Sequence, residues 1–152
     1  MNKGRVLLVA AALMALITAL AHMSCIVLGP ECYATQLAPT AIVESAKAGT
    51  WLAPVGTTLV SLLFVACALY ALSAAQIMKA LPFLSLAIKV ISSLCILRGL
   101  MGLALAFIYP ELTTKFAFIS SWLWLLSGIC FALGFKLMNK GVSVIQPESS
   151  RN

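Results

Sequence analysis

The sequence predicts an all-α membrane protein in which four transmembrane helices form an antiparallel bundle. Of its 152 residues, 62% are hydrophobic and 9% are charged, whereas globular domains average roughly 45–50% and 25%. The mean hydropathy of +1.08 reflects the same excess of apolar residues. Four runs each reach the length of about 20 mostly apolar residues that a membrane helix needs. We expect a single membrane domain over residues 1–152.

The four expected spans are separated by clear breaks, because proline ends or kinks a helix. Gly29-Pro30 stops the first span, Pro82 lies between the second and the third, and Pro110 lies between the third and the fourth. The spans cover residues 6–28, 52–75, 84–109 and 116–137. Short connections make consecutive helices antiparallel neighbours. Residues 138–152 are expected to form a tail, with a polar and frayed end over residues 146–152.

Basic residues set the orientation of such a bundle. If the N-terminus is cytoplasmic, six Lys and Arg residues at or beyond the span ends fall on the inner side, and two fall on the outer side. The inner set is Lys3, Arg5, Lys79, Lys136, Lys140 and Arg151, and the outer set is Lys47 and Lys115. Interfacial aromatic residues, Trp122 and Trp124 among them, gather near the outer side. We therefore expect both termini in the cytoplasm.

The longest connection, residues 29–50, is then an outer loop. Within it, the stretch PTAIVESAKAG predicts a short helix. Pro39 or Thr40 would begin this helix, and Gly49 would end it. Glu44 and Lys47 would pair at i,i+3 on its surface.

The first span is also compatible with a cleavable signal peptide, because MNKGR is basic and the following run is apolar. Cleavage after Ala19-Leu20-Ala21 would leave a chain of three spans that begins at His22. The apolar run continues to Leu28, past this site, which favours an uncleaved helix. Both alternatives remain open at this stage.

Two basic residues fall within the third span, where ionisable groups are costly and point to function. Lys89 lies near the inner end, so its side chain can reach the interface as an anchor. Arg98 lies about 20 Å from that end, too deep to do so easily. It shares one helix face with Cys95, Gly99 and Gly102, and small residues mark helix contacts in membranes. We therefore expect Arg98 to point into the bundle.

His22, the only histidine, shares a small-residue face of the first span with Thr18 and Cys25. Its expected depth resembles that of Arg98, so the two side chains would flank one outward-opening cavity. No span contains an acid, which leaves hydroxyl groups, backbone carbonyls, water or an anion as acceptors for Arg98. The candidate ligand or proton site comprises His22, Arg98, Thr18, Thr57 and Ser61. The competing interpretation gives these residues only structural hydrogen bonds between helices.

Cys25 and Cys32 form a candidate disulfide, because Gly29-Pro30 turns the chain between them at an oxidising outer interface. A zinc site of these two cysteines and His22 would lack a fourth ligand. A bis-histidine haem site would need a second histidine. We expect no cofactor and no metal.

The basic residues lie scattered at helix ends rather than on one face, which argues against a nucleic-acid partner. The expected partner is the lipid bilayer. Ser120, Ser127 and Gly134 recur every seven residues in the fourth span and form a small-residue seam. Such seams pack helices within a bundle or join the chain to other membrane proteins or to a second copy.

Several stretches resemble small, largely uncharacterised bacterial inner-membrane proteins with four spans. The stretches are GPECY, IVESAKAGTWLAP, LYALSAA, ALPFL and LRGL, all within about the first 100 residues. The matching positions are His22, Gly29, Pro30, Tyr33, Gly49, Tyr70, Ser73, Leu81, Pro82, Arg98 and Gly99. The resemblance implies a multi-pass protein of the bacterial inner (plasma) membrane and implies no activity.

The sequence therefore favours a membrane protein without enzymatic chemistry that acts as an accessory, interaction or immunity-type protein. The alternative is a small-molecule or proton-linked carrier or sensor with a site between His22 and Arg98. A third hypothesis is thiol redox work by Cys25 and Cys32.

Overall fold

The structure, a computed structural model, describes residues 2–145, with side chains as far as Asn139. The polar end of the expected tail, residues 146–152, lies outside the described residues. Within residues 2–145 the chain contains helices and no strands. The helices are α1 (Lys3–Leu28), α2 (Pro30–Thr35), α3 (Thr40–Lys47), α4 (Leu52–Ala74), α5 (Leu84–Ile108), the 3₁₀ helix η1 (Pro110–Leu112) and α6 (Lys115–Ile145).

Four of these helices, α1, α4, α5 and α6, are long and apolar enough to cross a membrane. The prediction of an all-α fold with four such segments is confirmed, and most boundaries differ by three residues or fewer. The C-terminal boundary differs more. The sequence predicted a tail from residue 138, but α6 continues through Ile145. No proline or glycine pair interrupts residues 138–145, and a helix can leave the bilayer without a break there.

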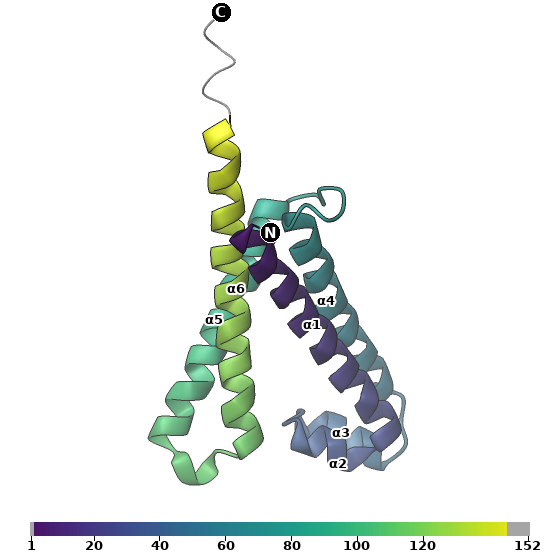
Figure 1. Cartoon of the computed structure of the whole chain (residues 1–152). Helices are drawn as coiled ribbons and strands as arrows, with labels where there is room; N and C mark the ends of the chain where they lie inside the picture. Colours follow the sequence, from purple (N-terminus) through teal and green to yellow (C-terminus); the bar gives the residue numbers. More distant parts are fainter. Residues whose placement is uncertain (1, 146–152) are drawn as a thin grey trace, which may run out of the picture.

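The long helices form two antiparallel pairs that cross near one end and diverge towards the other (Figure 1). One pair is α1 with α4, and the other is α5 with α6. We call the end with the N-terminus the basic end, and the end with α2 and α3 the loop end. α4 and α5 follow each other in the chain, but α5 packs chiefly on α6 and α4 chiefly on α1. The arrangement is thus more open than a bundle of equally packed neighbours.

The crossing of α1 with α6 depends on two glycines. A Cβ atom added to Gly4 would lie 2.8 Å from the carbonyl oxygen of Gly134. A Cβ atom added to Gly134 would lie 2.8 Å from the side chain of Leu8. Real Cβ atoms do not approach other atoms this closely, so only glycine permits the contact. The seam predicted in the fourth span therefore packs within the chain, at least at Gly134.

A core of small and apolar side chains surrounds this crossing, in the half of the molecule nearer the basic end. Leu8 of α1 is 0% exposed, and Ile88 of α5 and Phe131 of α6 are each 1% exposed. α4 contributes alanines, with Ala71 0% exposed. All four long helices meet only in this half.

The α5–α6 pair is held by a second set of glycines. A Cβ atom on Gly99 would lie 2.6 Å from the backbone nitrogen of Leu125, and one on Gly128 would lie 2.7 Å from Ile96. Gly99 was predicted to lie on a helix-contact face with Cys95, and both are buried. Close backbone approach of this kind drives helix association in lipid, where apolar burial contributes little.

The connection between α1 and α4 folds over the loop end of that pair (Figure 1). Gly29 ends α1 with a φ of 81°, a conformation that favours glycine. The helix predicted within residues 39–49 is present as α3, whereas α2 was not predicted, because Gly29-Pro30 was taken only as a stop. Pro30 instead begins α2, since proline suits the first position of a helix.

Ser45 fixes α3 against the start of α4. Its hydroxyl lies 2.6 Å from the Thr50 hydroxyl and accepts a hydrogen bond of 2.9 Å from the backbone N–H of Ala53. On the surface of α3, Lys47 donates to Glu44 at 3.1 Å, which is the predicted pair. α3 is therefore held by specific polar contacts as well as by apolar packing.

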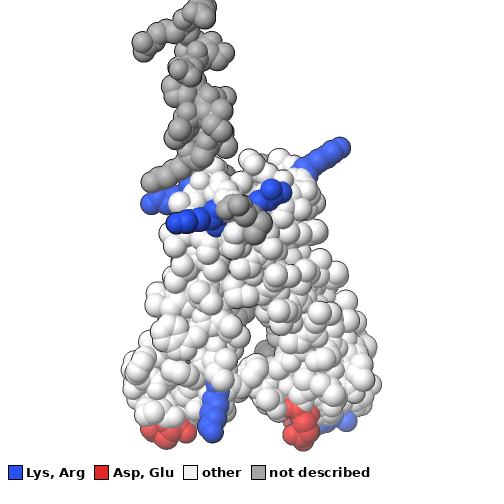
Figure 2. Space-filling view, in the orientation of Figure 1, with Lys and Arg blue, Asp and Glu red and all other residues white. Residues whose placement is uncertain are grey.

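Charged side chains are segregated between the two ends of the molecule (Figure 2). Most lysine and arginine side chains gather at the basic end, where Lys3 and Arg5 lie in the first turn of α1 and Lys79 lies between α4 and α5, whereas Lys47 and Lys115 lie at the loop end. The glutamates at the loop end are Glu31, Glu44 and Glu111. On the face shown in Figure 2, the surface between the two ends is almost entirely uncharged, as expected of a helix surface in contact with lipid.

The substitution Gly99→Ala should destabilise the protein by about 1–3 kcal/mol, because the added Cβ collides with the backbone of α6. Gly56→Ala is the matched control, since its Cβ would meet only Ile42, at 3.4 Å. Alanine favours a helix interior over glycine, so the control should be neutral or stabilising. Unfolding of both variants in detergent, followed by circular dichroism, measures the difference. Equal stability of the two variants would contradict the packing described for α5 and α6.

Candidate functional site

His22 is half-buried on α1 and stacks on the ring of Phe64 in α4. The ring centroids are 5.5 Å apart and the planes differ by 23°. Side chains on a helix tilt towards its N-terminus, and the two helices are antiparallel. His22 therefore leans towards the basic end and Phe64 leans towards the loop end, so their rings meet between the helices.

Phe64 also contacts Trp124 of α6, with ring centroids 5.6 Å apart and planes 53° apart. The three rings form a series that joins the α1–α4 pair to α6; we call it the ring series. The sequence reasoning placed Trp124 at the outer interface, but here it lies about 13 Å along α6 from Lys115. No signal marked Phe64, because phenylalanine is unremarkable in an apolar run. Only the crossing of the helices brings the three rings together.

Arg98 lies near the depth of Trp124, the last ring of the series. A Cβ atom on Gly99, the next residue of α5, would lie 2.6 Å from the backbone nitrogen of Leu125, the next residue of α6. The expectation that His22 and Arg98 lie at similar depths stays a prediction, since no contact among the described residues joins the two side chains.

Arg98 is exposed rather than enclosed by the bundle, contrary to the sequence expectation. Leu84 and Ile91 pack on the core near the basic end, and Arg98 follows Ile91 by seven residues on the same stripe of α5. Farther along this stripe, Leu105 is 53% exposed. The helix pairs have diverged at that depth, so the residues of this stripe no longer pack against α1 and α4. Arg98 therefore faces the space between the two pairs.

The space between the two pairs is visible as a hollow in the molecular surface at the loop end (Figure 2). The guanidinium of Arg98 turns towards this end, with Nη1 close to Gly102. In the part of the chain that the structure describes, Arg98 forms no hydrogen bond and no ion pair. The hollow therefore contains a positive charge without a counter-charge.

The hydroxyl groups of the other predicted members of the site donate hydrogen bonds to backbone carbonyls; these members are Thr18, Thr57 and Ser61. Thr18 donates to the Met14 carbonyl at 2.8 Å, within its own helix. Ser61 donates to the Ala19 carbonyl at 3.3 Å and so joins α4 to α1. Thr57 donates to the Ala53 carbonyl at 2.7 Å and lies 3.2 Å from the Tyr33 hydroxyl. None of these bonds reaches Arg98, and His22 and Arg98 are not hydrogen-bonded to each other.

Cys25 and Cys32 form a disulfide that joins α1 to α2, with Cα atoms 5.1 Å apart. Cys25 is 1% exposed and packs in a small apolar cluster with Tyr33 and Ala53. Gln36 adds a second tie between these helices, because its amide donates to the Ala21 carbonyl at 2.8 Å. This amide also interacts with the ring of His22. The loop end therefore fixes the position of His22 from one side.

Among the described residues, no three His, Cys, Asp or Glu side chains are grouped so that they could hold a metal ion. Comparison with known proteins gives no further identification: no family model, no curated protein and no solved structure matches this chain.

Thiol counting tests the disulfide. A maleimide applied to the unfolded, unreduced protein should label three cysteines, Cys67, Cys95 and Cys130. After reduction it should label all five cysteines of the chain. The variant Cys25→Ser should show four labels without reduction, because Cys32 loses its partner. Intact-mass spectrometry reads these numbers directly, and five labels on unreduced wild-type protein would exclude the bridge.

Proposed function

We propose that this chain is a non-catalytic, multi-pass protein that binds another membrane protein through the hollow between its helix pairs. The observation that carries this proposal is the exposed Arg98. It lies deep in a span, faces the hollow and lacks a counter-charge, and no span of the chain contains an acid. The occupant we propose is one transmembrane helix of a different protein, with an Asp or Glu at the depth of Arg98.

The energetics favour such an occupant. An arginine near the centre of a membrane helix costs about 2.5–3.5 kcal/mol by insertion measurements. A carboxylate on a partner helix would offset that cost through a charge-assisted, bidentate hydrogen bond. A second copy of this chain would bring another Arg98 and no acid, so charge disfavours self-association through the hollow. The proposed role is that of an accessory or protector subunit of a larger membrane assembly.

A carrier or sensor of a small anion is the second candidate, and the ring series favours it. His22, Phe64, Trp124 and Arg98 come from four different long helices; the three rings are in contact as a series, and Arg98 lies near the depth of Trp124. A small anion entering from the loop end would meet Arg98 and an aromatic wall. The thiol redox hypothesis is less well supported, because the Cys25–Cys32 bridge is packed against Tyr33 and ties two helices together.

We propose that the basic end lies in the cytoplasm of a bacterium and the loop end outside its inner membrane. The excess of Lys and Arg at the basic end over the loop end, which holds Lys47 and Lys115, supports this orientation through the positive-inside rule. We also infer that α1 is retained rather than cleaved, because Leu8 and Ala11 are 0% exposed in the core of the crossing.

Reporter fusions test orientation and retention together. Green fluorescent protein should fluoresce, and alkaline phosphatase should stay inactive, when either is fused after Asn152. Alkaline phosphatase fused after Gly49 should be active. A tag placed before Met1 should remain on the full-length membrane protein. Active phosphatase at the C-terminus, or loss of the N-terminal tag, would overturn the proposed topology.

Site-specific crosslinking tests the partner. A photoreactive residue at Leu105, on the Arg98 stripe, should capture a protein whose span contains an acid, in cells that naturally produce the chain. Leu100 is the matched control position, since it is 52% exposed on the opposite flank of α5. Arg98→Gln should reduce the adduct about tenfold or more, because removing one member of a buried charge pair costs at least about 2 kcal/mol. Replacing the partner's acid with its amide should have the same effect.

His22 separates the two candidate functions in the same experiment. His22→Gln should leave the Leu105 adduct intact if a partner helix pairs with Arg98. An adduct that Arg98→Gln leaves unchanged would contradict the proposal. Loss of biological function in His22→Gln, with normal insertion and an intact adduct, would instead favour the carrier or sensor.

A further inference from the structure

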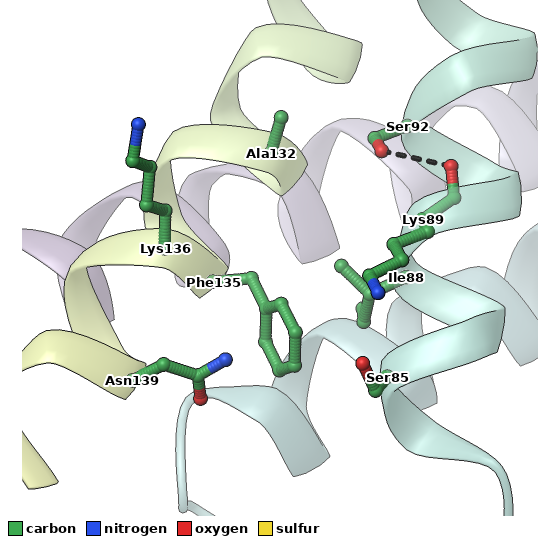
Figure 3. A pocket seen from close by; sticks show the side chains of 8 residues that line it. All are labelled: Ser85, Ile88, Lys89, Ser92, Ala132, Phe135, Lys136 and Asn139. Atoms are coloured by element: carbon green, nitrogen blue, oxygen red, sulfur yellow. Dashed lines mark hydrogen bonds between the residues drawn. The ribbon is translucent and has the colours of Figure 1, made fainter. Parts of the chain in front are cut away.

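A cavity of about 440 Å³ lies between α5 and α6 at the basic end, remote from the hollow (Figure 3). α5 lines it with Ser85, Ile88, Lys89 and Ser92, and α6 lines it with Ala132, Phe135, Lys136 and Asn139. The volume lies within the range of roughly 300–1,000 Å³ typical of ligand pockets. Neither the ring series nor Arg98 contributes to it.

Two lysines from facing helices give this cavity its charge. Figure 3 shows Lys89 reaching in from α5 towards Ile88, while Lys136 extends from α6 on the side away from the ring of Phe135 and lines the edge of the cavity. Both are exposed, so the cavity opens at the protein surface. The one ion pair among the described residues, Lys47 with Glu44, lies at the opposite end of the molecule. Two like charges that line one cavity repel each other, and an anion bound in the cavity would offset that repulsion.

Polar and apolar groups divide the cavity in a way that suits an amphiphile. Ser85 and Asn139 lie on its polar side, whereas Ile88, Ala132 and the ring of Phe135 provide an apolar wall. The Ser92 hydroxyl donates to the Lys89 carbonyl at 3.0 Å and is buried at the inner end of the α5 wall. A phosphate with a glycerol backbone matches this division, with the phosphate at the lysines and the glycerol at the apolar wall.

The depth of the cavity matches the headgroup level of a bilayer. Lys89 lies about 7.5 Å along α5 from its first residue, Leu84. Lys136 lies about 4.5 Å along α6 from Asn139, the lining residue of α6 nearest the C-terminal end of that helix. Lipid headgroups extend several ångströms beyond each side of a hydrocarbon core of about 30 Å. Lysine stems also carry their charges outward from the core.

We propose that this cavity binds the headgroup of one anionic phospholipid. Its position between two spanning helices favours a lipid already present in the bilayer over a soluble anion. Basic pockets between transmembrane helices are suited to such headgroups. Lys89, which the sequence presented only as an anchor, is then one of two phosphate ligands. This proposal is independent of the partner helix proposed for the hollow, because the two sites lie on different parts of α5.

Native mass spectrometry of the intact chain, with phosphatidylglycerol titrated into the detergent, tests the site. One lipid should bind per chain and saturate. Lys89→Gln with Lys136→Gln should weaken binding about thirtyfold, because each basic residue near an anionic surface contributes roughly a factor of five. Lys3→Gln with Lys79→Gln is the matched control, since it removes the same charge from the same end outside the cavity. That control should bind like the wild type.

A second variant keeps both charges and fills the space. Ala132→Phe should abolish the saturable binding while it leaves helicity and thermal unfolding unchanged. Phosphatidylcholine should bind at least tenfold more weakly than phosphatidylglycerol, and inorganic phosphate should not displace the lipid. Equal weakening in the cavity and control variants would show that Lys89 and Lys136 are ordinary interfacial anchors and would overturn the proposal. Displacement by inorganic phosphate would assign the cavity to a soluble anion instead.

Discussion

The close contact between Gly4 of α1 and Gly134 of α6 is the constraint on which the rest of the structure depends. In lipid, apolar burial drives helices together only weakly, so association depends on close backbone approach and polar contacts. This contact fixes one crossing near the basic end and places Leu8 and Phe131 in the core around it. Because the helices cross at an angle there, the two pairs must diverge towards the loop end (Figure 1).

In this geometry, some polar groups of the spans are hydrogen-bonded at helix contacts, whereas Arg98 is left without a partner among the described residues. Near helix contacts, hydroxyl groups such as those of Ser61 and Thr57 bond to backbone or side-chain oxygens of adjacent elements, as buried polar groups must. Beyond the crossing, Arg98 has no hydrogen-bond partner among the described residues, although α6 still packs against α5 at Gly99. The same divergence that leaves Arg98 exposed also brings the ring series to the top of the hollow. A costly charge and an aromatic wall therefore meet at one depth.

The two ends of the molecule carry different chemistry. At the loop end, a disulfide, the Gln36 amide and the Ser45 hydroxyl hold two short helices against α1 and α4. At the basic end, two lysines, Lys89 and Lys136, line the cavity between α5 and α6. The tied helices α2 and α3 at the loop end would fix the depth of α1 in the bilayer, and a lipid bound in the cavity at the basic end would fix the depth of α5. A pairing between Arg98 and a residue of a partner helix requires that Arg98 lie at a defined depth.

The sequence by itself determined the class of the protein, the number of long apolar helices and most of their ends, because hydrophobic length and proline breaks are local properties. It also identified Arg98 and His22, because a charge in an apolar run is conspicuous without any structure. Only the tertiary structure decided that Arg98 is exposed, that Thr57 and Ser61 are engaged elsewhere and that Phe64 and Trp124 join the site. These outcomes depend on the angle at which α1 crosses α6. The angle arises from contacts between residues more than 100 positions apart, such as Gly4 and Gly134, which no local pattern encodes.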